Sequence, residues 1–231
     1  MKYKHLFFDL DNTLWDFDKN SQVSLHELFD AYQLIHYYPR FEDFFEIFKK
    51  QNEVLWEMYG KGQIDKNFLH YERFRFPFEN TPFEAQLRYK ELADEYLLVV
   101  KTKTHLKPFA KEILEYLKDK NYMMYIVSNG FTEVQYHKLE NAGIGTYFQR
   151  IFLSESIKEH KPSKAFFDYA ITSSNARKTE SLVIGDNWEA DIVGAKNAGI
   201  DQVFYNYTNR IDLPFAPTFQ VSCLSDLKNL I

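Results

Sequence analysis

Residues 4–13 read Lys-His-Leu-Phe-Phe-Asp-Leu-Asp-Asn-Thr, a short apolar run that stops at two carboxylates. This pattern is typical of a buried strand whose carboxyl end meets solvent. The stretch predicts a first strand at 4–9, followed by a loop that carries Asp11 two residues after Asp9. Two carboxylates this close repel each other, so the pKa of at least one is expected to be raised unless a cation lies between them.

The second half of the chain alternates helix-like and strand-like segments. Beyond Pro108, apolar stripes at helical spacing are separated by short apolar runs at 122–127, 150–153, 182–184, 202–205 and 219–221. Strands that alternate with helices predict a parallel sheet covered on both faces. Right-handed crossovers place every strand's carboxyl end at one edge, where ligands bind. We therefore expect an α/β fold with a Rossmann-like, doubly wound parallel sheet.

A block of helical patterns interrupts this alternation directly after the first strand. One apolar stripe runs from Phe41 to Tyr59, and Gly60 is expected to end that helix in the left-handed conformation. Thr81-Pro82-Phe83-Glu84 has the form of a capping box and predicts one helix from there to about Val100. We interpret the block as an inserted α-helical cap domain at 16–101, with the catalytic core formed by 1–15 and 102–231.

Composition excludes several classes of function. The 28 basic and 33 acidic residues give a formal charge of −5, which argues against nucleic-acid polymers as partners. No apolar run approaches the roughly 18 residues of a membrane helix, and the N-terminal run is too short for a signal peptide. The single cysteine, Cys223, cannot form an internal disulfide, which fits a reducing compartment. We expect a cytoplasmic protein without membrane association, as a monomer or small homo-oligomer.

Three further polar segments lie at the same predicted edge as Asp9. Ser128-Asn129-Gly130 offers a hydroxyl, an amide and a glycine ahead of a helix N-terminus, which favours anion binding. Lys161 is a cation that can neutralise a carboxylate and a phosphate together. Asp186 and Asp191 supply the hard oxygen ligands that Mg²⁺ prefers. Together these segments predict a metal-dependent phosphate site.

Each segment also has a purely structural interpretation. The Ser128-Asn129-Gly130 segment can be a helix-capping turn, and Asp191 can cap the helix that begins nearby. Lys161 has neighbouring lysines that compete for its role, and an isolated lysine is usually solvated. In the helical block, Trp56 and Tyr59 can be core residues of a bundle rather than a platform on which a base stacks.

In chain order the four segments resemble the four motifs of the haloacid dehalogenase-like hydrolase superfamily, and the inserted helices resemble its first type of helical cap. The resemblance implies that Asp9 is a nucleophile that forms an aspartyl-phosphate and also binds Mg²⁺. It implies that Asp11 is the general acid and base, and that its main-chain carbonyl is a second metal ligand. The remaining implied roles are phosphate binding by Thr13, Ser128, Asn129, Gly130 and Lys161, metal ligation by Asp186, and support of the metal site by Asn187 and Asp191.

Finer features resemble the bacterial pyrimidine 5′-nucleotidase branch of this superfamily. They are Leu55-Trp56, Tyr59, Gly62, Ile64, His70, Arg73, Phe74 and Asn129-Gly130-Phe131-Thr132. This resemblance implies a Mg²⁺-dependent phosphomonoesterase for pyrimidine nucleoside 5′-monophosphates, with Trp56, Tyr59 and Arg73 setting substrate specificity.

Two alternatives stay open. One is a phosphatase or mutase for a sugar phosphate or another small phosphometabolite. The other is a catalytically inactive phosphate-binding or scaffold protein. Asp11 argues for phosphate chemistry over dehalogenation, because a dehalogenase has no alkoxide to protonate and lacks a carboxylate at that position.

Overall fold

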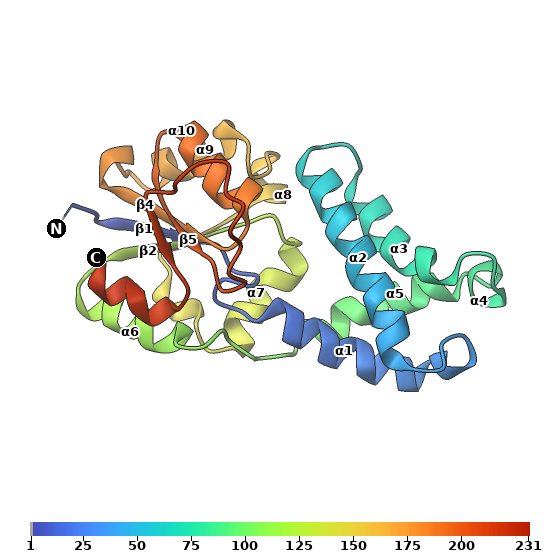
Figure 1. Cartoon of the computed structure of the whole chain (residues 1–231). Coiled ribbons are helices and arrows are strands. Elements are labelled where there is room, and N and C mark those ends of the chain that lie inside the picture. The colour runs from blue at the N-terminus through green and yellow to red at the C-terminus, as the bar shows by residue number, and fades with distance from the viewer. Residues whose placement is uncertain (1) are drawn as a thin grey trace. The chain divides into compact units, whose positions relative to one another are not determined.

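The computed structural model describes residues 2–231, which contain a six-stranded sheet in the order β3-β2-β1-β4-β5-β6 (Figure 1). All five neighbouring pairs are parallel, so all carboxyl ends point to the same edge. The first strand lies between β2 and β4, in the middle of the sheet. The predicted α/β fold is confirmed. The strands are β1 (His5–Phe8), β2 (Met123–Ser128), β3 (Arg150–Leu153), β4 (Ser181–Gly185), β5 (Asp201–Tyr205) and β6 (Phe219–Val221).

Helices cover both faces of this sheet, with α9 and α10 on one side and α6 and α7 on the other (Figure 1). Side chains alternate between the two faces of a strand. Phe7 of β1 accordingly packs with Phe166 and Phe167 of α9, while Leu6 and Phe8 point to the opposite face. The helices are α6 (Ala110–Asp119), α7 (Thr132–Asn141), α8 (Ser154–Ile157), α9 (Lys164–Ser173) and α10 (Gly194–Ala198), the last preceded by a π-helical turn, Trp188–Val193.

The chain divides into two compact units, Met1–Phe17 with Thr104–Ile231, and Asp18–Lys103. Aromatic rings build the interior of the second, helical unit. Phe74 lies 5.0 Å from Phe48 and 5.3 Å from Tyr96 between ring centroids, and all three rings are buried. Its helices are α1, which begins at the boundary (Phe17–Ala31), α2 (Phe41–Gly60), α3 (Lys66–Arg75), α4 (Pro82–Ala85) and α5 (Arg88–Val100).

Two details of the helical unit differ from the sequence prediction. Gly60 is still helical, and the left-handed glycine is Gly62, with φ +68°. The capping bond from Glu84 N–H to Thr81 forms, but α4 ends at Ala85 and Leu87 takes φ +57° before α5 begins. The single-helix prediction was wrong because packing overrides the pattern: the short α4 buries Phe83 against Phe78, with ring centroids 4.3 Å apart.

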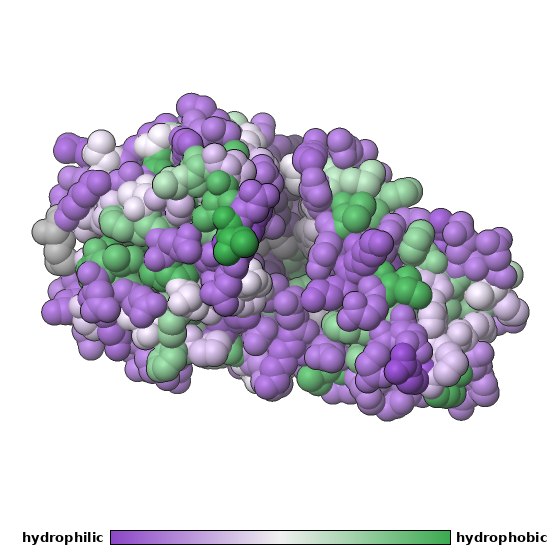
Figure 2. Space-filling view, in the orientation of Figure 1, coloured by the Kyte–Doolittle hydropathy of each residue, from purple (hydrophilic) through white to green (hydrophobic). Residues whose placement is uncertain are grey.

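Within residues 2–231 none of the helices combines the length and apolar character that a bilayer crossing requires. The face of the molecule in Figure 2 is mostly hydrophilic, with hydrophobic residues in small patches.

The packing of β1 generates a test of the core. Phe7 is 1% exposed and stacks on Tyr125 with centroids 4.8 Å apart, so Phe7→Ala removes a central ring and leaves a cavity. We expect this change to lower the free energy of unfolding by about 3–5 kcal/mol, measured by urea denaturation. Tyr136→Ala, at an exposed position on α7, is the matched control and is expected to change stability by less than about 0.5 kcal/mol. Equal losses in the two variants would contradict this account of the core.

Candidate active site

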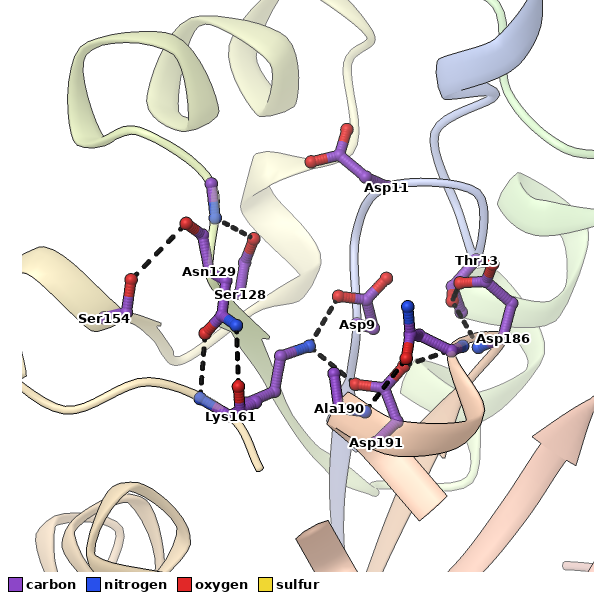
Figure 3. Close-up of polar contacts among 12 residues, drawn as sticks. Asp9, Asp11, Thr13, Ser128, Asn129, Ser154, Lys161, Asp186, Ala190 and Asp191 are labelled. Carbon is purple, nitrogen blue, oxygen red and sulfur yellow. Dashed lines mark hydrogen bonds and ion pairs between the residues drawn. The ribbon is translucent and has the colours of Figure 1, made fainter. Parts of the chain in front are cut away.

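The polar segments predicted at the sheet edge do meet there (Figure 3). Asp9 follows β1, and its N–H still donates to the Ile184 carbonyl of β4 at 2.9 Å. Ser128 ends β2 and Asp186 follows β4, while Lys161 comes from the loop before α9. The strand ends and this loop therefore place side chains that are far apart in the sequence around one point.

Lys161 is the buried cation of this edge. Its Nζ donates to Asp9 Oδ1 at 2.7 Å and to Asp191 Oδ1 at 2.6 Å. The residue is 3% exposed. Burial alone would lower the pKa of Lys161, but the charges of Asp191 and Asp9 outweigh burial and raise it above its ordinary value. Lys161 therefore remains an ammonium that fixes two carboxylates.

Asn129 fixes the backbone of Lys161 rather than facing the carboxylates. Its side-chain Nδ2 donates to the Lys161 carbonyl, and its Oδ1 accepts from the Lys161 N–H, both at 2.9 Å. Ser154 donates to the Asn129 carbonyl at 3.4 Å. The sequence prediction gave Asn129 a part in phosphate binding, and the contacts in the structure show that its amide holds the lysine loop against the end of β2.

Three carboxylates converge beside Lys161. Oxygen atoms of Asp9, Asp186 and Asp191 all lie within 4.8 Å of one another. Burial raises the pKa of Asp9 to about 7, opposed by Lys161 and reinforced by Asp191. Burial, followed by the charges of Asp9 and Asp191, also raises the pKa of Asp186 well above its ordinary value. When all three carboxylates are ionised, they exceed the charge of the one ammonium by two negative charges, and their hard oxygens fit a divalent cation such as Mg²⁺.

Thr13 and Asn187 hold two of these carboxylates in place. The Thr13 hydroxyl donates to Asp186 Oδ1 at 2.9 Å and accepts from the Asp186 N–H at 3.1 Å. The Asn187 N–H donates to Asp191 Oδ2 at 3.1 Å. Thr13, predicted as a phosphate-binding hydroxyl, therefore uses its proton on a carboxylate. Asp191, predicted at the outside of the metal site, is fully buried with both oxygens hydrogen-bonded.

Asp11 lies in different surroundings from Asp9. The strand ends at Phe8 and the next turn has Asn12 at φ +62°, so the Asp11 carboxylate points away from Asp9 (Figure 3). Repulsion by Asp11 is accordingly the smallest cause of the raised pKa of Asp9, and burial is the largest. The pKa of one of the two carboxylates is raised, as the sequence predicts, but burial and not repulsion by Asp11 is the main cause, since the loop separates the two side chains.

Gln135 and Lys138 are site residues that the sequence analysis missed. Both lie on α7, and they donate to Asp11 Oδ2 and Oδ1 at 2.8 and 2.6 Å. Their spacing of three positions places them on one helix face. That spacing was the one available signal, but long polar side chains on a helix are usually solvated, and nothing local distinguishes these two.

The hydroxyl proton of Ser128 is available to donate a hydrogen bond. Its Oγ accepts from the Gly130 N–H at 3.0 Å and from Gln135 Nε2 at 2.7 Å. A hydroxyl has one proton and two acceptor positions, so these two bonds leave the proton for a further acceptor such as a phosphate oxygen. A side chain at Gly130 would overlap the Gln135 amide, which explains a glycine here.

Comparison with known proteins agrees with this geometry. A family model described as haloacid dehalogenase-like hydrolase matches residues 6–205. The chain belongs to this family. Pyrimidine 5′-nucleotidase PynA of Streptococcus pneumoniae is 31% identical over 98% of this chain and 94% of its own length. Pyrimidine 5′-nucleotidase YjjG of Escherichia coli is also 31% identical, over 100% of this chain and 99% of its own length.

A solved structure supports the same relationship. The magnesium-bound HAD-hydrolase YfnB of Bacillus subtilis superposes with a TM-score of 0.89 at 27% sequence identity, covering 100% of this chain and 99% of that chain. As a haloacid dehalogenase-like hydrolase, the protein is an enzyme, and the resemblance inferred from the four sequence segments is confirmed.

The residues predicted to set specificity in this hydrolase lie in its helical unit. Trp56 and Tyr59 of α2 form an edge-to-face pair with centroids 5.7 Å apart, and Trp56 is partly exposed. Arg73 of α3 is 2% exposed, with its guanidinium 5.4 Å from the Phe74 ring and 5.2 Å from the Tyr96 ring. Burial lowers the pKa of Arg73 to about 10. Arg73 therefore has a packing role within the helical unit in addition to its charge.

Close packing at Gly185 provides a test of the carboxylate cluster. A Cβ at this position would overlap the Asp191 carboxylate, so Gly185→Ala has to displace the partner of Lys161. We expect a loss of about 1–3 kcal/mol in the free energy of unfolding, measured by urea denaturation. Gly145→Ala is the matched control, because its added methyl meets Leu139 atoms at an ordinary 3.6 Å or more. A Gly185→Ala protein as stable as the Gly145→Ala protein would show that the cluster can rearrange freely.

Proposed function

We propose that this hydrolase is a Mg²⁺-dependent phosphomonoesterase that cleaves pyrimidine nucleoside 5′-monophosphates through an aspartyl-phosphate on Asp9. The observation that carries the proposal is the buried carboxylate of Asp9, oriented by the Lys161 ammonium at 2.7 Å beside a serine whose proton is left for an acceptor. Phosphoryl transfer requires alignment and charge neutralisation above all, and this arrangement provides both.

In the first step Asp9 Oδ2 attacks phosphorus. Lys161 binds the other oxygen, Oδ1, so the carboxylate is held with Oδ2 open, and within residues 2–231 no side chain hydrogen-bonds Oδ2. The bond from Asp9 to phosphorus forms as the bond from phosphorus to the 5′-oxygen breaks, and Asp11 gives its proton to that oxygen. Ser128 donates to a phosphoryl oxygen in this step.

In the second step water attacks the aspartyl-phosphate. Asp11, now ionised, accepts the proton of that water, the bond between phosphorus and Asp9 breaks, and inorganic phosphate leaves. The carboxylate of Asp9 is restored with Lys161 still bound to Oδ1. The cycle consumes one water and leaves the side chains in their starting protonation states.

Asp9 and Asp186 would hold Mg²⁺, which the closeness of their carboxylate oxygens supports. The main-chain carbonyl of Asp11 would be the further ligand that the family resemblance implies. Asp191 would support the site through its bonds to Lys161 and the Asn187 N–H. Bound Mg²⁺ supplies positive charge that offsets the carboxylates and the phosphoryl oxygens.

Support for a pyrimidine nucleotide comes from two sources. The two relatives at 31% identity over almost the whole chain carry the name pyrimidine 5′-nucleotidase. The partly exposed ring of Trp56, braced edge-to-face by Tyr59, is a suitable surface for stacking a base.

A substrate panel tests this proposal. We expect phosphate release to be fastest with UMP, dUMP or dTMP among nucleoside monophosphates and sugar phosphates, and to stop on chelation of Mg²⁺. Asp9→Asn is expected to lower kcat by at least about 10³-fold while leaving circular dichroism unchanged, because the amide cannot act as the nucleophile.

The outcomes of the panel separate the parts of the proposal. A preference for sugar phosphates would contradict the nucleotidase assignment and keep the phosphomonoesterase chemistry. Absence of turnover with every phosphomonoester, or an active Asp9→Asn protein, would contradict the chemistry itself and favour a scaffold role.

The pH dependence of Mg²⁺ binding is a second test. The pKa of Asp9 is about 7 in the folded chain against an ordinary 3.8, so the folded state holds an extra proton between these values and loses stability as pH rises through them. Mg²⁺ must displace protons from Asp9 and Asp186 at low pH. We therefore expect Mg²⁺ to raise the melting temperature more at about pH 8 than at about pH 5.5.

Asp186→Asn is the control for that measurement. Removing one carboxylate of the cluster should abolish most of the Mg²⁺-dependent shift at both pH values, since the cluster of oxygens within 4.8 Å is then broken. Equal shifts at the two pH values, or a full shift in Asp186→Asn, would contradict Mg²⁺ binding by these carboxylates.

A further inference from the structure

Two donors on one face of helix α7 hold the carboxylate of Asp11. Lys138 Nζ lies 2.6 Å from Oδ1, and Gln135 Nε2 lies 2.8 Å from Oδ2. Residues three apart on a helix project side by side, so both oxygens are bound from the same direction. The orientation of this carboxylate is therefore determined by the two side chains of α7 as well as by the hydrogen-bonded turn that follows β1.

Both donors are buried, which is unusual for long polar side chains on a helix. Lys138 is 4% exposed, and its ammonium lies 4.3 Å from the ring centroid of Trp15 and 5.5 Å from that of Phe17. Aromatic faces attract cations, and the Asp11 carboxylate supplies the opposite charge. Burial of an ammonium costs free energy unless such partners are fixed around it, so Lys138 and Asp11 constrain each other.

Gln135 connects Asp11 to the serine that is prepared to donate to phosphate. One amide hydrogen of its Nε2 goes to Asp11, and the other goes to Ser128 Oγ at 2.7 Å. Gln135 is fully buried, and its Oε1 has no hydrogen-bond partner in the described part of the chain. An unsatisfied buried acceptor is costly, so the two donor bonds are what keep the amide in this orientation.

We propose that Gln135 and Lys138 are positioning residues that aim the Asp11 carboxylate at the leaving-group oxygen. This inference rests on the proposed phosphomonoesterase function. In an in-line displacement the leaving oxygen lies on the far side of phosphorus from Asp9. The group that protonates this oxygen therefore has to lie away from Asp9. Figure 3 shows the Asp11 carboxylate turned away from Asp9 and Lys161, as this geometry requires. Without the two donors the carboxylate rotates among several rotamers, of which only some are aligned.

Two substrates whose leaving groups differ in basicity distinguish a positioning role from a merely structural one. An alkyl phosphate, such as a nucleoside monophosphate, releases a strongly basic alkoxide that must be protonated. p-Nitrophenyl phosphate releases a weakly basic phenoxide that departs without a proton. Because kcat/KM reports the steps through formation of the aspartyl-phosphate, the ratio of kcat/KM for the two substrates measures proton donation to the leaving group.

The experiment compares Gln135→Met and Lys138→Met with the unaltered protein, using the best alkyl phosphate of the substrate panel against p-nitrophenyl phosphate. Methionine keeps the approximate size of both side chains and removes their donors. We expect kcat/KM for the alkyl phosphate to fall about 10- to 100-fold, which is part of the roughly 10²- to 10⁴-fold that general acid catalysis contributes, and kcat/KM for p-nitrophenyl phosphate to fall less than about 3-fold. Asp11→Asn sets the full size of the effect, and Lys111→Met, at an exposed position on α6, is expected to change neither value.

Each remaining outcome is decisive. An equal loss of kcat/KM with both substrates in Gln135→Met and Lys138→Met leaves the ratio unchanged. That result would show a structural role and overturn the inference. Because the ratio is taken within one protein sample, a fraction of unfolded enzyme cancels from it. A selective loss in Asp11→Asn without one in the two methionine variants would overturn the inference alone, whereas absence of phosphomonoester hydrolysis in the unaltered protein would overturn the proposed function with it.

Discussion

The ammonium of Lys161, buried between Asp9 and Asp191, is the interaction on which the rest of the site depends. Moving any of these charges out of water costs several kcal/mol. Only close pairing together with further hydrogen bonds offsets that cost. The surrounding chain supplies those conditions. Asn129 binds the lysine backbone at both its N–H and its carbonyl, and Gly185 leaves room for the Asp191 carboxylate. Features that look independent in the sequence thus serve one buried ion cluster.

The same cluster supports the divalent cation that we propose for this edge. Lys161 already divides its charge between two carboxylates, and Asp186 adds a third beside them. Without another cation, the cluster lowers the repulsion between its carboxylates by holding a proton. The raised pKa values of Asp9 and Asp186 are consistent with this. A phosphate monoester would bring still more negative charge. The proposed cation would therefore have to balance the protein's own carboxylates before the edge could attract an anion.

The sequence predicted the sheet and the edge well because both depend on local patterns. An apolar run that ends in a polar residue marks a strand end, and parallel strands bring their ends together, so Asp9, Ser128 and Asp186 could be grouped without any structure. The rest depends on contacts between distant segments. Gln135 and Lys138 meet Asp11 across more than 120 residues, and nothing local marks them as buried. The break at Leu87 likewise follows from the packing of Phe83 and not from helix propensity.

Asp9 and Asp11 stand two residues apart in the sequence, yet the fold gives them separate partners. The strand ends at Phe8, and the left-handed turn at Asn12 carries Asp11 toward α7 while Asp9 stays in register with β4. Each carboxylate then meets its own buried ammonium, Lys161 for Asp9 and Lys138 for Asp11. The two surroundings differ in what else binds the carboxylate, because Lys161 also binds Asp191, whereas Lys138 and Gln135 each bind one oxygen of Asp11. A single strand end followed by one tight turn is sufficient to create that difference.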